Sequence, residues 1–223
     1  MMSVNDEATG LDERRQRLVD SWVGAHAVRD LRVLTAMRQV PREAFVPEAL
    51  REQVYEDVPL PIGFGQTISQ PFMVARMAEA LELTGMERVL EVGTGSGYAA
   101  AVLSLLVQEV QTVEIIEELA RDAAVRLESL GYSNVAVHVG DGSRGWAAAE
   151  PYDAIAVAAG GPSVPDELSR QLLPGGRLIM PIGEREEQTL VRIRRTAVGY
   201  EREELEVVRF VPLLGAAGWA SNP

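Results

Sequence analysis

The pattern of apolar and polar positions changes near residue 88 of this 223-residue chain. Before that point, apolar residues recur at helical spacing from Leu11 to Met37, which predicts two short helices. A further amphipathic helix is expected from Pro71 to Leu83. Residues 58–65, rich in Pro and Gly, predict a loop between them. Residues 1–10 are polar and are expected to form a flexible N-terminus.

From residue 88 onward, short apolar runs alternate with helical patterns. Strands are predicted at Arg88–Val92, Val110–Ile115, Val135–Val139, Tyr152–Ala158 and Arg177–Pro181, and helices at Tyr98–Val107, Glu117–Leu130 and Pro165–Leu172. Such alternation indicates an α/β fold with a doubly wound, Rossmann-like parallel sheet.

The last part of the chain follows a different pattern. Thr189–Arg195 and Glu203–Val211 alternate apolar and polar residues with no helix between them, which predicts a C-terminal antiparallel hairpin with one solvated face. Its turn is expected near Val198 and Gly199. The domain organisation predicted is one domain over residues 11–218, with a helical and loop part at 11–83 and a cofactor-binding part at 84–218.

Composition and charge narrow the function classes. Hydrophobic residues make up 47% of the chain and charged residues 24%, which is ordinary for a globule with a core. The chain has no cysteine, which excludes a thiolate nucleophile and a cysteine metal site. No apolar run is long enough for a membrane helix, and no secretory signal is recognisable, so a cytoplasmic location is expected. The net charge of −12 disfavours nucleic acid as a partner.

The strongest local signal is a glycine-rich turn between the strand at residue 88 and the helix after it. It reads Glu91, Val92, Gly93, Thr94, Gly95, Ser96, Gly97. Glycines at such a turn let the backbone approach a ligand beyond the carboxyl ends of the strands. The spacing G-x-G-x-G differs from the dinucleotide fingerprint, and a carboxylate two positions before the first glycine suits a cofactor with an ammonium and a sulfonium group better than a pyrophosphate. The alternative is that the glycines only form a tight turn without binding a ligand. The position of the turn between a buried strand and a helix disfavours this alternative.

Two further acidic positions extend this site. Glu114, followed by Ile115, ends the second predicted strand, where its carboxylate can accept hydrogen bonds from both hydroxyls of a ribose. Asp141, followed by Gly142, comes after the third strand and can accept one from an adenine amino group. Each would be unremarkable alone, as a solvated strand end or a turn. In order after the glycines, they predict a nucleoside site.

Several blocks of the sequence resemble the protein-L-isoaspartate (D-aspartate) O-methyltransferase family, over nearly the whole chain from about Leu11 to Gly215. They are Val33–Met37, Val40–Pro47, Pro59–Pro71, Val89–Tyr98, Leu130–Val135, Gly140–Gly142 and Val208–Leu213. The glycine block is shared with many methyltransferases, whereas Gln66–Pro71 is highly specific to this family.

The resemblance implies a class I methyltransferase that uses S-adenosylmethionine for protein repair. Its substrates would be L-isoaspartyl and D-aspartyl residues in damaged proteins, whose free carboxylate is methylated. The ester then collapses to a succinimide, which reopens partly to normal aspartate. Ser69 matches the active-site serine of the family, and Gln66, Thr67 and Ile68 match a lid over the cofactor. We expect no metal, no membrane association and a monomeric protein.

This reaction needs little acid–base machinery, because a carboxylate is already an anion at neutral pH. A serine hydroxyl that orients one carboxylate oxygen would be sufficient, although Ser69 could instead cap the helix that follows it. His26 and His138, the two histidines, lie in no motif with Ser69, which disfavours a Ser-His-Asp triad.

Three other functions remain open at this point. The chain could methylate a small molecule or a biosynthetic peptide, it could bind adenosylmethionine without catalysis, or it could be a nicotinamide oxidoreductase. An intact Ser69 and a complete cofactor series argue against the second, and the glycine spacing disfavours the third.

Overall fold

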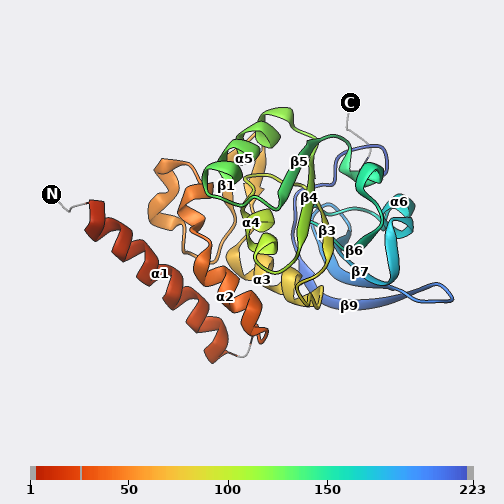
Figure 1. Cartoon of the computed structure of the whole chain (residues 1–223), viewed down its shortest axis with the longest axis horizontal. Helices are drawn as coiled ribbons and strands as arrows, with labels where there is room; N and C mark the ends of the chain where they lie inside the picture. Colours follow the sequence, from red (N-terminus) through yellow and green to blue (C-terminus); the bar gives the residue numbers. More distant parts are fainter. Residues whose placement is uncertain (1–3, 26, 220–223) are drawn as a thin grey trace.

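A seven-stranded sheet organises the protein, whose computed structural model describes residues 4–25 and 27–219 (Figure 1). The strand order is β5-β4-β3-β6-β7-β8-β9. The strands are β3 (Arg88–Val92), β4 (Glu109–Glu114), β5 (Val135–Val139), β6 (Tyr152–Val157), β7 (Leu172–Gly183), β8 (Gln188–Arg195) and β9 (Tyr200–Val208). Neighbours from β5 to β7 are parallel, and β8 and β9 add in antiparallel fashion. The order reverses at β3, between β4 and β6, which is where this kind of sheet binds ligands.

Helices and a small hairpin surround the sheet. The helices are α1 (Val4–Gly24), α2 (Leu31–Gln39), α3 (Pro71–Ala80), α4 (Tyr98–Ser104), α5 (Glu117–Ser129) and α6 (Asp166–Arg170), with short 3-10 turns at Arg42–Phe45, Glu48–Gln53, Gly142–Arg144 and Ala147–Ala149. The hairpin consists of β1 (Leu60–Gly63) and β2 (Gln66–Ile68). It leads directly through Ser69 into α3.

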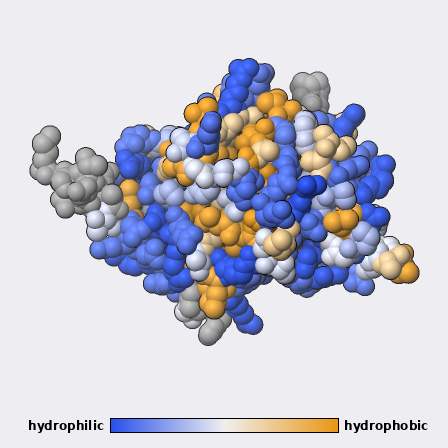
Figure 2. Space-filling model, in the orientation of Figure 1, coloured by the Kyte–Doolittle hydropathy of each residue, from blue (hydrophilic) through white to orange (hydrophobic). Residues whose placement is uncertain are grey.

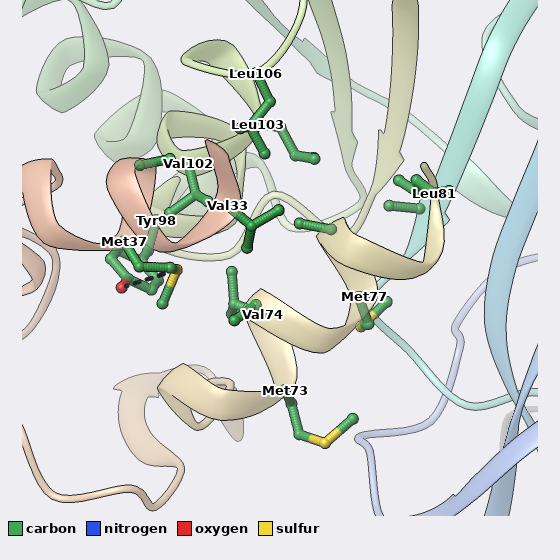
Figure 3. Close-up of a cluster of buried hydrophobic side chains, with 14 of the residues drawn as sticks. Val33, Met37, Met73, Val74, Met77, Leu81, Tyr98, Val102, Leu103 and Leu106 are labelled. Atoms are coloured by element: carbon green, nitrogen blue, oxygen red, sulfur yellow. Dashed lines mark hydrogen bonds between the residues drawn. The ribbon is translucent and has the colours of Figure 1, made fainter. Parts of the chain in front are cut away.

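Two apolar layers hold these elements on opposite faces of the sheet. The larger layer joins α2, α3 and α4 to one face, and Figure 3 shows Val33 and Met37 of α2 directed toward Val74 of α3 and Tyr98 of α4. The smaller layer includes Leu168 of α6 on the other face. Helices on both faces make the sheet doubly wound, as the sequence predicted.

The face in Figure 2 is mostly hydrophilic at its rim, with hydrophobic residues gathered toward the middle. Within the described residues, no helix combines the length and the apolar character needed to cross a membrane.

The structure confirms the doubly wound sheet and the C-terminal hairpin, and it corrects several predicted boundaries. The first helix begins at Val4 and not near Leu11. The loop predicted at residues 58–65 contains β1. The helix predicted to reach Leu172 ends at Arg170, because Leu172 pairs with Tyr152 and both side chains are fully buried in the sheet. The flexibility of residues 1–10 and the division at residue 84 stay predictions, and residues 1–3 lie outside the described part.

Candidate active site

A cleft of about 780 Å³, counting the space open to solvent at its mouth, lies beyond the carboxyl ends of β3 and β4. This volume is in the usual range for a small-molecule site. Four separate segments form most of its walls: residues 66–69 from the hairpin, the glycine turn at 93–96, residues 114–116 at the end of β4, and residues 211–214 after β9. The cleft is therefore built jointly by the hairpin that precedes the sheet, by the ends of β3 and β4, and by the segment that follows β9.

Most of the predicted site residues meet at this cleft. Those in its walls are Gln66, Thr67, Ile68, Ser69, Gly93, Thr94, Gly95, Ser96, Glu114, Ile115 and Gly142. Glu91, Gly97 and Asp141 are predicted site residues that are not part of the wall. Sequence reasoning missed a further set that lines it, namely Val74, Val92, Tyr98, Ala99, Val113, Ile116, Ala158, Ala159, Val211, Pro212, Leu213 and Leu214.

Backbone conformation and a close neighbour together favour glycine at two positions of the glycine turn. Gly95 has φ +53°, and a Cβ there would lie 3.3 Å from Ile62 of β1. Gly97 has φ +90°, and its Cβ would lie 3.2 Å from Leu127 of α5. Both backbone conformations are left-handed, which side chains disfavour. The glycines thus allow the hairpin and α5 to pack closely against the turn.

Glu114 braces the same turn from the end of β4. Its Oε2 accepts a hydrogen bond from the Gly95 amide (2.9 Å), and its Oε1 accepts one from the Ile116 amide (3.0 Å). A carboxylate has about four lone-pair sites, so each oxygen retains the capacity to accept another hydrogen bond. Glu114 is buried yet lies in the cleft wall, which is the position expected of a ribose acceptor.

Glu91 lies behind the wall and is almost fully buried. Its Oε2 accepts a hydrogen bond from Thr112 (2.6 Å), whereas its Oε1 has no partner within residues 4–25 and 27–219. Burial raises the pKa of the Glu91 carboxyl to about 8, the Thr112 hydrogen bond opposes that rise, and the nearby charge of Glu114 adds to it. A buried carboxyl with an unpaired oxygen is a group that a cation can stabilise.

Asp141 is engaged by the protein itself. Its Oδ1 accepts hydrogen bonds from the backbone and hydroxyl of Ser143, and its Oδ2 accepts one from the Ala216 amide (2.9 Å). These contacts attach the segment after β9 to the sheet, so that residues 211–214 are held in the cleft wall. The predicted contact of Asp141 with adenine stays a prediction.

Ser69 is partly buried in the cleft wall. The residue that caps α3 is Gln70, which makes no side-chain capping bond, and Pro71 follows it. The alternative that Ser69 is the N-cap of α3 is therefore wrong.

Neither histidine takes part in this site. His138 stacks on Trp146 at 4.2 Å between ring centroids, and its Nε2 is 2.6 Å from Gln111 on β4. His26 lies outside the described residues. Within those residues, no three acidic or histidine side chains are grouped closely enough to hold a metal ion.

A doubly wound sheet with a glycine turn, a carboxylate at the end of the adjacent strand and an antiparallel C-terminal hairpin defines the class of Rossmann-like methyltransferases. Residues 13–218 match the sequence model of the family described as protein-L-isoaspartate(D-aspartate) O-methyltransferase (PCMT). The chain therefore belongs to this family, as the sequence resemblance indicated.

Relatives of known sequence agree. The chain is 58% identical over 220 residues to protein-L-isoaspartate O-methyltransferase 1 of Rhodopseudomonas palustris (strain HaA2), covering 98% of this chain and 90% of the relative. It is 59% identical over 208 residues to protein-L-isoaspartate O-methyltransferase 2 of Pelobacter propionicus, covering 92% of each.

Solved structures support the same fold. One, a protein-L-isoaspartate O-methyltransferase, superposes with a TM-score of 0.80 at 31% identity, over 91% of this chain and 66% of that longer chain. Another, a beta-aspartate methyltransferase (PCMT) from Plasmodium falciparum in complex with S-adenosyl-L-homocysteine, has a TM-score of 0.75 at 26% identity, over 90% of this chain and 98% of that one. Membership of an adenosylmethionine-dependent family confirms the predicted class of cofactor.

Proposed function

We propose that this chain transfers the methyl group of S-adenosylmethionine to the free carboxylate of L-isoaspartyl, and less efficiently D-aspartyl, residues in damaged proteins. The observation that carries the proposal is the position of Ser69. The segment most specific to the family, Gln66–Pro71, places this hydroxyl in the wall of the same cleft as the glycine turn. Relatives at 58–59% identity carry the name of this activity.

The cleft has the groups that this cofactor needs. We assign Glu114 to the ribose hydroxyls, the turn from Gly93 to Gly97 to close backbone contact, and Gly142 with Asp141 to the adenine end. Gln66, Thr67 and Ile68, with Ser69, would cover the cofactor from the hairpin side. The unpaired oxygen of Glu91 beneath the turn favours a ligand with positive charge over a pyrophosphate.

The residues of the chain act mainly by orientation. When bound, S-adenosylmethionine supplies a methyl group that is already activated by a positively charged sulfur. The substrate carboxylate is ionised at neutral pH, so no side chain has to remove a proton. The Ser69 hydroxyl donates a hydrogen bond to one carboxylate oxygen and directs the other toward the methyl group. Orientation of this kind can lower a barrier by roughly 7–11 kcal/mol.

A pair of matched peptides tests this function. Radiolabelled methyl transfer would be measured for an isoaspartyl peptide and for its aspartyl counterpart of the same sequence. We expect methylation of the first and essentially none of the second. Equal rates on both peptides, or activity confined to small molecules, would favour a methyltransferase of another substrate class. Binding of adenosylmethionine with no transfer to any of them would favour a non-catalytic binding protein.

Three expectations about the setting of this activity remain predictions. They are a cytoplasmic location, a monomeric state, and the absence of nucleic-acid and membrane partners. The acidic net charge of −12 supports the expectation about nucleic acid.

A further inference from the structure

Three side chains connect a buried carboxyl to the wall of the cleft. Glu91 on β3 is 1% exposed, and Thr112 on the neighbouring β4 donates a hydrogen bond to its Oε2 (2.6 Å). The hydroxyl oxygens of Thr112 and Thr94 lie 2.6 Å apart. Thr94 belongs to the glycine turn and lines the cleft. Glu91 is thus linked to the cleft by two hydrogen bonds in series.

The protonation state of Glu91 fixes the direction of both bonds. An ionised carboxylate can only accept, so Thr112 donates to Glu91 and Thr94 donates to Thr112. Each hydroxyl has one hydrogen, and the Thr94 oxygen is then left with lone pairs alone. When Glu91 is ionised, the Thr94 hydroxyl can therefore only accept a hydrogen bond from a further partner.

When the Glu91 carboxyl is neutral, the direction of both hydrogen bonds is reversed. Its hydrogen is best placed on Oε2, facing Thr112, because the buried Oε1 has no partner among the described residues. Glu91 then donates to Thr112, and Thr112 donates to Thr94. The Thr94 hydrogen is released from the chain and is available to the cleft as a donor.

Few charged side chains lie close to the hydrogen-bonded series Glu91–Thr112–Thr94. Glu114, at the end of β4, is the charged side chain whose field reaches Glu91, and it favours the neutral form. On α4, the phenol of Tyr98 is neutral, since burial raises its pKa to about 12. On α3, Arg76 and Glu79 form an ion pair with each other. No cation of the protein is hydrogen-bonded to Glu91 within the described residues.

We propose that the chain from Glu91 through Thr112 to Thr94 senses the charge of the ligand in the cleft: Glu91 ionises when the positively charged cofactor binds and takes up a proton again when the sulfur becomes neutral. This inference rests on the proposed placement of the cofactor in this cleft. Its physical basis is that a cation in a low-dielectric site favours both a nearby carboxylate and an acceptor at Thr94.

The charges balance over one catalytic cycle. On binding, Glu91 gives one proton to solvent. Methyl transfer then joins a substrate carboxylate to the methyl group, so the negative charge of the carboxylate and the positive charge of the sulfur disappear together. Glu91 has lost its cationic partner and recovers a proton from solvent. Adenosylmethionine and S-adenosylhomocysteine differ only in that methyl group and charge, which makes the second compound a natural control.

Calorimetry of the folded protein measures this proton directly. The heat of binding would be compared at pH 7 in phosphate and in Tris, because the difference reports protons exchanged with the buffer. A carboxyl with a pKa near 8 is roughly nine-tenths protonated at pH 7, so we expect release of most of one proton with adenosylmethionine. S-adenosylhomocysteine should release distinctly less. The ratio of the two affinities should move in favour of adenosylmethionine, by up to about tenfold per pH unit, between pH 6 and pH 8.

Matched variants test whether the proton release depends on Glu91 and on the Thr112 hydroxyl. Glu91→Gln should abolish the proton release. Thr112→Val removes the central hydroxyl and should reduce the difference between the two ligands, whereas Thr112→Ser retains the hydroxyl and should preserve it. Equal proton release with both ligands, or unchanged release in Glu91→Gln, would overturn the proposal while leaving the cofactor placement intact. Failure of the folded wild-type protein to bind adenosylmethionine would refute the placement and the charge sensor together.

Discussion

The carboxylate of Asp57 accepts a hydrogen bond from the backbone amide of Phe72, with 2.8 Å between Oδ1 and N. Phe72 is the second residue of α3, and the first amides of a helix have no partner within it. Asp57, which precedes β1, therefore performs the capping that Ser69 could have performed. The Ser69 hydroxyl at the cleft remains available to a substrate.

This division of roles predicts opposite effects of two substitutions. Ser69→Ala should leave the thermal midpoint nearly unchanged and lower turnover by roughly ten- to hundredfold, the equivalent of about 1.5–3 kcal/mol for a hydrogen bond to a charged group. Ser69→Thr, which keeps the hydroxyl, should be partly active. Asp57→Ala should lose about 0.5–2 kcal/mol of stability. Full turnover of Ser69→Ala on the isoaspartyl peptide would show that another group holds the carboxylate.

Glu114 should contribute to cofactor affinity. Glu114→Ala is expected to weaken adenosylmethionine binding roughly ten- to hundredfold, because a charged acceptor of hydrogen bonds worth about 1.5–3 kcal/mol is lost. Calorimetry would measure the change, with circular dichroism to verify the fold. Glu117→Ala, an exposed carboxylate at the start of α5, serves as the matched control. Equal affinity of the Glu114 variant and the control would contradict the ribose assignment.

The stability of the ligand-free protein should depend on pH through Glu91. Its pKa is raised to about 8 by burial, so the folded state keeps a proton that the unfolded chain loses near pH 4.5. Wild-type stability is therefore lost through this group as pH rises from about 4.5 to about 8, and no further loss follows above that range. The Glu91→Gln variant has no carboxyl to ionise at this position. Its stability relative to wild type should therefore increase with pH over the same range, by at most about 1.4 kcal/mol per pH unit. Urea unfolding at pH 5, 6.5 and 8 would measure it, and a constant difference would contradict the raised pKa.

The segment after β9 should matter for binding through Gly215. Gly215 has φ +117°, and a Cβ there would lie 2.0 Å from Oδ1 of Asp141. Gly215→Ala should displace residues 211–214 from the wall and weaken cofactor binding. Gly175→Ala provides the control, because Gly175 also has a left-handed φ (+83°) but nothing lies within 4 Å of its Cβ. Gly175→Ala should lose roughly 1–2 kcal/mol of stability from backbone strain, and Gly215→Ala should lose more because of its clash with Asp141. Equal cofactor affinities of the two variants would show that the segment does not shape the site.

The parts of the site that could be predicted from the sequence are those set by local spacing. The glycine turn and Glu114 follow consecutive strands of a parallel sheet, so topology alone brings their ends together. The Asp57 cap spans 15 positions and the Asp141–Ala216 contact spans 75, and no periodic pattern encodes such pairs. Likewise, β1, the first strand of the hairpin, lay within a segment whose Pro and Gly content indicated only a loop. Its form depends on Gly63 and Gly65, whose φ values are +93° and +70°.

The wall formed by residues 211–214 also has a consequence for biosynthesis. Proteins are made from the N-terminus, and their parts begin to fold while the chain is still growing. The sheet from β3 to β7 can assemble first, but the cleft stays open until the residues after β9 have emerged and Ala216 has reached Asp141. A nascent chain therefore acquires its glycine turn before its complete cleft.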